Sequence, residues 1–103
     1  MKPKQVNIMS RIYKIEYCNS AEQVDPFNKS ENDLGAISRG REEIRMFDGG
    51  RQWQSVFVDL MHEVLHGIVF ETGGPLATED NHNWLNTYAT AMADVLLRNG
   101  WVK

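Results

Sequence analysis

The chain has 103 residues, of which 42% are hydrophobic and 24% are charged, and its formal net charge is -3. This length predicts one domain over residues 1–103 with a single modest core, and the composition is ordinary for a globular protein. A negative charge without a basic cluster argues against nucleic acid as a partner, and no apolar run is long enough to predict a membrane span.

Residue patterns typical of β-strands dominate the N-terminal half of the chain. Residues 6–17 alternate apolar and polar side chains and predict one strand, and the polar residues 18–33 predict a loop with one short helical turn. Residues 34–38 and 41–47 predict a hairpin joined at Arg39 and Gly40. The charged flank of its second strand, which begins at Arg41 and ends at Phe47, is typical of a solvent-facing edge strand.

Two helices are predicted in the C-terminal half. Residues 51–71 follow the sheet breaker at residues 48–50 and are apolar on nearly every side, which indicates a central, buried helix. Thr78 can cap a last helix over residues 79–98, which Asn99 and Gly100 close. Its predicted apolar stripe is Leu85, Tyr88, Ala89, Met92, Val95 and Leu96. The order of elements predicts a small α+β domain, with an antiparallel or mixed sheet of about three strands packed on a central helix and a C-terminal helix.

The only cysteine, Cys18, lies at the end of the first predicted strand. A single cysteine cannot form an internal disulfide, so we expect a reducing, cytoplasmic location. We interpret Cys18 as a packed side chain rather than a metal ligand or redox switch.

An H-E-x-x-H motif, formed by His62, Glu63 and His66, lies within the predicted central helix. Two histidines four residues apart on a helix are separated by only ~40° around its axis, so both rings can reach one metal ion. Glu63, one position further round, points toward the open side of that ion. The motif therefore predicts a zinc site of the catalytic type. The alternative is a pair of hydrogen-bonded core histidines with Glu63 in a salt bridge.

A third protein ligand is needed, because a catalytic zinc has three protein ligands and one open position. Glu71 is a poor candidate, since nine residues place it ~180° from His62 on the same helix. His82, which flanks the stripe of the last helix, is the preferred ligand, and Glu79 in the first turn is the alternative. Asp59 lies one turn before His62 on the same face. Its carboxylate either hydrogen-bonds a ligand imidazole and so fixes that ring, or it is solvated or ion-paired.

Around this motif the chain resembles the minigluzincins, small H-E-x-x-H proteins encoded mainly by phages and prophages. They are similar in outline to ImmA/IrrE-type and SprT-like metallopeptidases. The likeness covers the motif helix (residues 54–68), with looser similarity over residues 13–17, 35–46 and 89–99. It implies a zincin-like fold, a bound Zn²⁺ and an extended substrate paired with the outer strand of the hairpin, near Arg41 to Phe47. The family's third ligand is usually a glutamate early in the last helix, where this chain has His82 with Glu79 just upstream.

The expected function is that of a zinc-dependent metallopeptidase, a hydrolase whose partner is a peptide or protein substrate. In it, Glu63 would be the general base and a zinc-bound water the nucleophile. One alternative is a non-enzymatic, zinc-stabilised adaptor of the phage or prophage type. Another is a metal-free interaction domain that uses the hairpin edge, and that edge would also permit a dimer.

Overall fold

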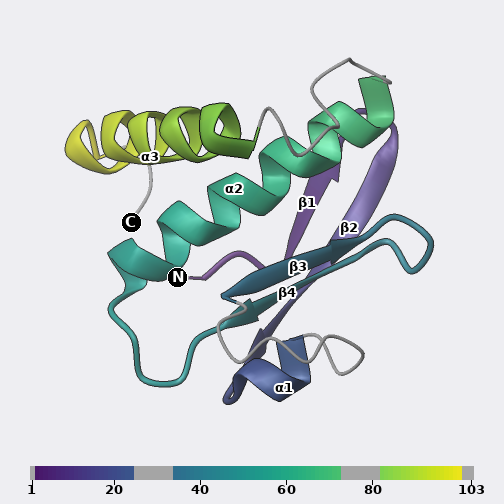
Figure 1. Ribbon diagram of the computed structural model, residues 1–103, viewed down its shortest axis with the longest axis horizontal. Coiled ribbons are helices and arrows are strands. Elements are labelled where there is room, and N and C mark those ends of the chain that lie inside the picture. The colour runs from purple at the N-terminus through teal and green to yellow at the C-terminus, as the bar shows by residue number, and fades with distance from the viewer. Residues whose placement is uncertain (1, 25–33, 73–81, 101–103) are drawn as a thin grey trace.

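A computed structural model describes residues 2–24, 34–72 and 82–100 of the chain (Figure 1). The elements in these ranges are β1 (Gln5–Ile8), β2 (Arg11–Cys18), α1 (Ala21–Val24), β3 (Gly35–Ser38), β4 (Glu43–Phe47), α2 (Trp53–Thr72) and α3 (His82–Arg98). They form a small α+β fold, in which a four-stranded mixed sheet is followed by two helices. The predicted fold class is therefore confirmed, with one strand more than expected.

The additional strand comes from residues 6–17, which fold as the antiparallel hairpin β1–β2 rather than as one strand. Val6 pairs with Tyr13, and Ile8 pairs with Arg11 across the turn. Met9 takes the left-handed conformation at this turn, with φ of 58°. Left-handed turn positions usually carry glycine or asparagine, so a methionine gives no signal that the chain reverses here.

The strand order is β1-β2-β4-β3, and the two hairpins meet through the parallel pair β2–β4. The predicted edge position of residues 41–47 is therefore wrong: β4 is central, and β1 and β3 form the edges. Of the charged residues that suggested an edge, Glu43 and Arg45 lie on one face of β4, where they form an ion pair. Ile44 and Met46 alternate with them and are fully buried on the other face. A charged flank thus marked an exposed face and not an exposed edge.

The central helix α2 confirms its prediction and ends at Thr72, whose Oγ1 donates a hydrogen bond to the carbonyl of Ile68 at 2.8 Å. Figure 1 shows α2 lying between the sheet and α3. The core forms where α2 meets the inner face of the sheet, because apolar side chains of both elements leave water there. Its buried residues are Ile8, Tyr13, Ile15, Ile44, Met46, Val56, Phe57, Leu60 and Ala93.

The helix α3 runs to Arg98 and is closed by Gly100, which has φ of 69°. The buried residues of α3 are Leu85, Ala89 and Ala93, and the predicted stripe contained only the first two of them. The exposed members of the predicted stripe are Tyr88, Met92 and Val95. Small alanines at the buried positions let the two helices approach closely, which moves the interface away from the larger side chains.

Two predicted features fall outside the described residues, namely most of the loop at residues 18–33 and the Thr78 cap. Within the described ranges, no helix has the length and apolar character that crossing a membrane requires.

Candidate metal centre

The two motif histidines converge on each other from successive turns of α2. Their Nε2 atoms are 3.0 Å apart, and their ring planes are inclined at 69°. Both residues are half-buried, and Nδ1 of His62 is on the buried side of its ring. The Nε2 edges of the two rings therefore point to a common position on one side of the helix.

This convergence fits the spacing that a zinc ion imposes on two imidazole ligands. With Zn–N bonds of ~2.0–2.1 Å and a tetrahedral angle, two ligand nitrogens lie ~3.3 Å apart. The observed 3.0 Å is within a few tenths of an ångström of that value, so small side-chain rotations would suffice. The donor set also suits zinc, since neutral imidazole is among its commonest ligands.

The same contact is equally a hydrogen bond between two neutral imidazoles, in which one Nε2 donates and the other accepts. That arrangement is the hydrogen-bonded histidine pair of the alternative interpretation. Distance alone does not separate the two interpretations, because ligand nitrogens on one ion and hydrogen-bonded nitrogens have similar spacings.

Glu63 is a buried charged residue, with 8% of the residue exposed. It lies against β3, where a Cβ added to Gly35 would be 3.1 Å from Glu63 Cγ and 3.1 Å from Met46 Sδ. Sequence reasoning did not single out Gly35. A glycine at the start of a strand is nevertheless a known sign that another group approaches the backbone closely, and here that group is the proposed base.

The edge strand β3 presents part of its main chain beside Glu63. The amide of Phe47 donates to the carbonyl of Leu34 at 3.0 Å, which fixes the alternation of the antiparallel ladder. Alternate residues of such a ladder point their amide and carbonyl groups at the partner strand. Gly35 and Ile37 fall in the other set, so their main-chain groups face the edge away from β4.

The third zinc ligand lies beyond what the described side chains show. His82 is the first residue of α3, and counting 100° per residue puts Ala89 and Ala93 within ~20° of it. Both alanines are buried, so the backbone position of His82 lies on the face of α3 that packs inward. The side chain of His82 and the whole of Glu79 are outside the described residues. Among side chains that the structure describes, no three metal-binding groups come together. Both third-ligand candidates stay predictions.

Asp59 forms an ion pair with Arg51, with 2.5 Å between Oδ2 and Nη2. Arg51 also donates from Nη1 to the carbonyl of Phe47 at 3.0 Å, just before α2 begins. The ion-paired interpretation of Asp59 therefore has a direct structural basis, and its contribution is to tie the start of α2 to the end of β4.

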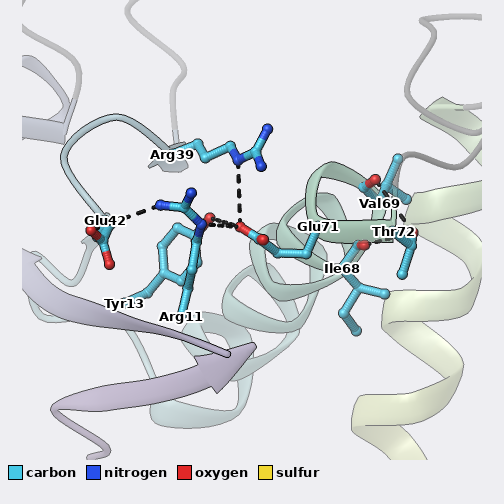
Figure 2. A network of polar contacts seen from close by, with 8 residues as sticks. All are labelled: Arg11, Tyr13, Arg39, Glu42, Ile68, Val69, Glu71 and Thr72. Carbon is cyan, nitrogen blue, oxygen red and sulfur yellow. Dashed lines mark hydrogen bonds and ion pairs between the residues drawn. The ribbon is translucent and has the colours of Figure 1, made fainter. Parts of the chain in front are cut away.

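The helical period places Glu71 ~180° from His62 around α2, and Figure 2 shows its carboxylate facing Arg11, Tyr13 and Arg39. Glu71 Oε1 accepts a hydrogen bond from Tyr13 Oη at 3.0 Å and forms ion pairs with Arg11 Nε at 3.0 Å and with Arg39 Nε at 3.5 Å. Only 8% of the Glu71 side chain is exposed. Burial raises the pKa of Tyr13, and the Glu71 carboxylate raises it further. This network joins the end of α2 to the tips of both hairpins and was not predicted.

Cys18 is buried and free, in agreement with its prediction as a packed side chain. Burial is the main cause that raises the pKa of its thiol, which disfavours the reactive thiolate.

Comparisons of the chain with protein families, with curated proteins and with solved structures found no match. The resemblance to minigluzincins therefore remains a prediction, carried by the H-E-x-x-H motif.

Proposed function

We propose that this protein is a zinc-dependent metallopeptidase with a zincin-like domain. The observation that carries the proposal is the 3.0 Å approach of the His62 and His66 Nε2 atoms, with the intervening Glu63 on the same helix. His62 and His66 would hold the ion, together with His82 or Glu79. Zinc bound there supplies Lewis acidity, which lowers the pKa of a water and polarises a carbonyl.

The role of Glu63 in this proposal is to move the proton. As general base its carboxylate takes the proton of the attacking water, and as general acid it returns that proton to the leaving amine. Its buried position against Gly35 limits its side-chain freedom. A group held in this way loses less entropy when the reacting geometry forms.

The substrate would add to the sheet along β3 rather than along residues 41–47. The central position of β4 leaves no edge there, whereas Gly35 and Ile37 present main-chain groups beside Glu63. An extended peptide that pairs with this edge gains affinity from main-chain hydrogen bonds that do not depend on its side chains. We therefore expect β3 to be the docking edge.

A second candidate is a zinc-stabilised interaction protein without catalysis. The same histidine pair supports it, because a small core gains folding free energy from a bound metal. The two functions differ in their need for Glu63. Only the peptidase loses its function when Glu63 becomes glutamine.

The first test measures zinc per chain by elemental mass spectrometry after metal loading and gel filtration. We expect about one zinc in the wild type, none in His62→Ala, and a loss in either His82→Ala or Glu79→Ala that identifies the third ligand. Asp94→Asn, on the exposed side of α3, is the control and should keep its zinc. A wild type that stays metal-free after loading would contradict both zinc functions.

The second test follows hydrolysis of a degenerate peptide pool by mass spectrometry. Zinc-loaded wild type should cut the pool, and zinc-loaded Glu63→Gln should be slower by about 10²–10⁴-fold, the usual contribution of a general base. Equal products from both proteins would point to a contaminating peptidase. A zinc-loaded wild type that cuts nothing would favour the interaction protein.

A further inference from the structure

Arg39 is the residue that directly follows β3, the proposed docking edge, and its guanidinium is held in place. Its Nε lies 3.5 Å from Oε1 of the buried Glu71, while 53% of the Arg39 side chain is exposed. Figure 2 shows Nε as the Arg39 nitrogen that meets this carboxylate, with the two terminal nitrogens beyond it along the side chain. An arginine oriented through Nε presents its terminal nitrogens as a fixed pair of donors, which is the geometry that a carboxylate accepts.

Arg11, the other guanidinium on Glu71, is placed differently. It lies between two carboxylates, with Nε 3.0 Å from Glu71 Oε1 and Nη1 3.8 Å from Glu42 Oε1. Its charge is thus balanced on both sides within the protein. Among the described residues, Arg39 forms an ion pair with Glu71 alone, through Nε, so it is the guanidinium that we expect a ligand to use.

The distance along the strand fixes where on a substrate this donor pair would act. Gly35 lies against Glu63, and Arg39 is four residues further on, which is ~13 Å at ~3.3 Å per residue. A peptide paired with β3 keeps the same rise per residue, so the side chain opposite Arg39 is about four residues from the bond nearest Glu63.

We propose that Arg39 is a specificity-determining residue that binds an acidic side chain of the peptide substrate, about four residues from the cleaved bond. Glu71 is a positioning residue in this arrangement, because it orients Arg39 without meeting the substrate. The net charge of -3 would repel acidic peptides at long range, so a preference for them has to come from a local contact such as this one. The inference rests on the proposed use of β3 as the docking edge.

Peptide binding tests the inference separately from hydrolysis. The protein is zinc-loaded Glu63→Gln, which keeps the peptide intact. The probes are short fluorescein-labelled peptides with one Glu moved stepwise along an uncharged sequence, and a matched set with Gln at the same positions. Fluorescence anisotropy should show one Glu position that binds on the order of fivefold more tightly than its Gln counterpart, as expected for a half-exposed ion pair.

Three further substitutions test whether Arg39 causes that preference. Adding Arg39→Gln should abolish it, and Arg39→Lys should keep part of it. Adding Arg98→Gln, which removes the same charge from the exposed end of α3, should leave it intact. The inference is overturned if no Glu position is preferred or no peptide binds, if the preference survives Arg39→Gln, or if Arg98→Gln removes it equally.

Hydrolysis by the zinc-loaded protein with its native Glu63 is measured in parallel. A Glu preference in binding without any cleavage would contradict the peptidase and keep Arg39 as the residue that selects an acidic side chain in a bound peptide. Cleavage without a Glu preference would contradict the inference and keep the peptidase.

Discussion

The backbone of Gly35 lies directly against the side chain of Glu63, so that a Cβ at residue 35 would stand 3.1 Å from Glu63 Cγ. The edge strand and the motif helix thus touch at the one acidic residue on which catalysis would depend. The same Cβ would also stand 3.2 Å from Met46 Cε in the core. Space at residue 35 is therefore limited from two sides.

Gly35→Ala should destabilise the fold by about 1 kcal/mol, because overpacking exceeds the entropy gained by replacing glycine. It should also slow any Glu63-dependent hydrolysis, since Glu63 must shift. Urea unfolding gives the free energy of unfolding. Gly40→Ala is the matched control, with nothing within 4 Å of its added Cβ, and should be neutral or slightly stabilising. Equal stabilities of the two variants would show that Met46 and Glu63 give way freely.

Zinc that binds the folded chain should raise its free energy of unfolding. At free zinc about 100-fold above the dissociation constant, the gain in unfolding free energy is about 2.7 kcal/mol, and a chelator should reverse it. Differential scanning calorimetry with and without zinc measures this as a rise in Tm. His62→Ala and His66→Ala should show no rise. The same rise in these variants would locate the bound zinc elsewhere on the chain.

Loss of the Glu71 carboxylate should weaken the contact between α2 and the two hairpin tips. Glu71→Gln replaces the charge-assisted hydrogen bond from Tyr13 by a neutral one and removes both ion pairs. We expect a loss of about 1–2 kcal/mol, at the low end because both arginines are half-exposed. Chemical unfolding measures the loss. Asp94→Asn removes a carboxylate from the exposed pair with Arg98 and should change stability little. If the two losses match, the Glu71 network behaves as an ordinary surface contact.

The burial of Tyr17 should make the free energy of unfolding fall at alkaline pH. Burial, and to a lesser degree the Asp48 carboxylate, raises the pKa of Tyr17 from 10.0 to about 12. The unfolded chain therefore loses this proton first, and the stabilising effect, complete below pH ~10, disappears as pH rises toward ~12. Urea unfolding at increasing pH should give a shallower decline for Tyr17→Phe than for wild type. Tyr88→Phe, at an exposed ring on α3, should keep the wild-type slope.

The helices and the motif could be predicted from the sequence because their signals are local. The apolar residues around His62 define a buried helix wherever the sheet lies, and glycine marks the end of α3. The spacing of His62 and His66 alone predicts that their rings meet, and the Nε2 atoms do approach to 3.0 Å.

The sheet order could not be predicted, because it depends on which strands meet after the chain has folded back. Glu43 and Arg45 look the same in sequence on a central strand as on an edge strand. The Glu71 network was missed for the same reason. Tyr13 and Arg39 are far from Glu71 in sequence, and only the parallel seam between β2 and β4 brings the tips of the two hairpins to the end of α2.

The parallel pairing of β2 with β4 also sets the order in which parts of the fold can form. Each hairpin closes through contacts between near neighbours in sequence, but the pairing of Lys14 with Glu43 and of Cys18 with Phe47 closes a long loop. Loop closure of this kind costs entropy before its contacts can repay it, and it slows folding. The hairpins can therefore form early and independently, whereas the surface on which α2 packs exists only after they join. A folding chain would therefore form its hairpins before the sheet surface that holds α2, and the contact between Gly35 and Glu63 would come last.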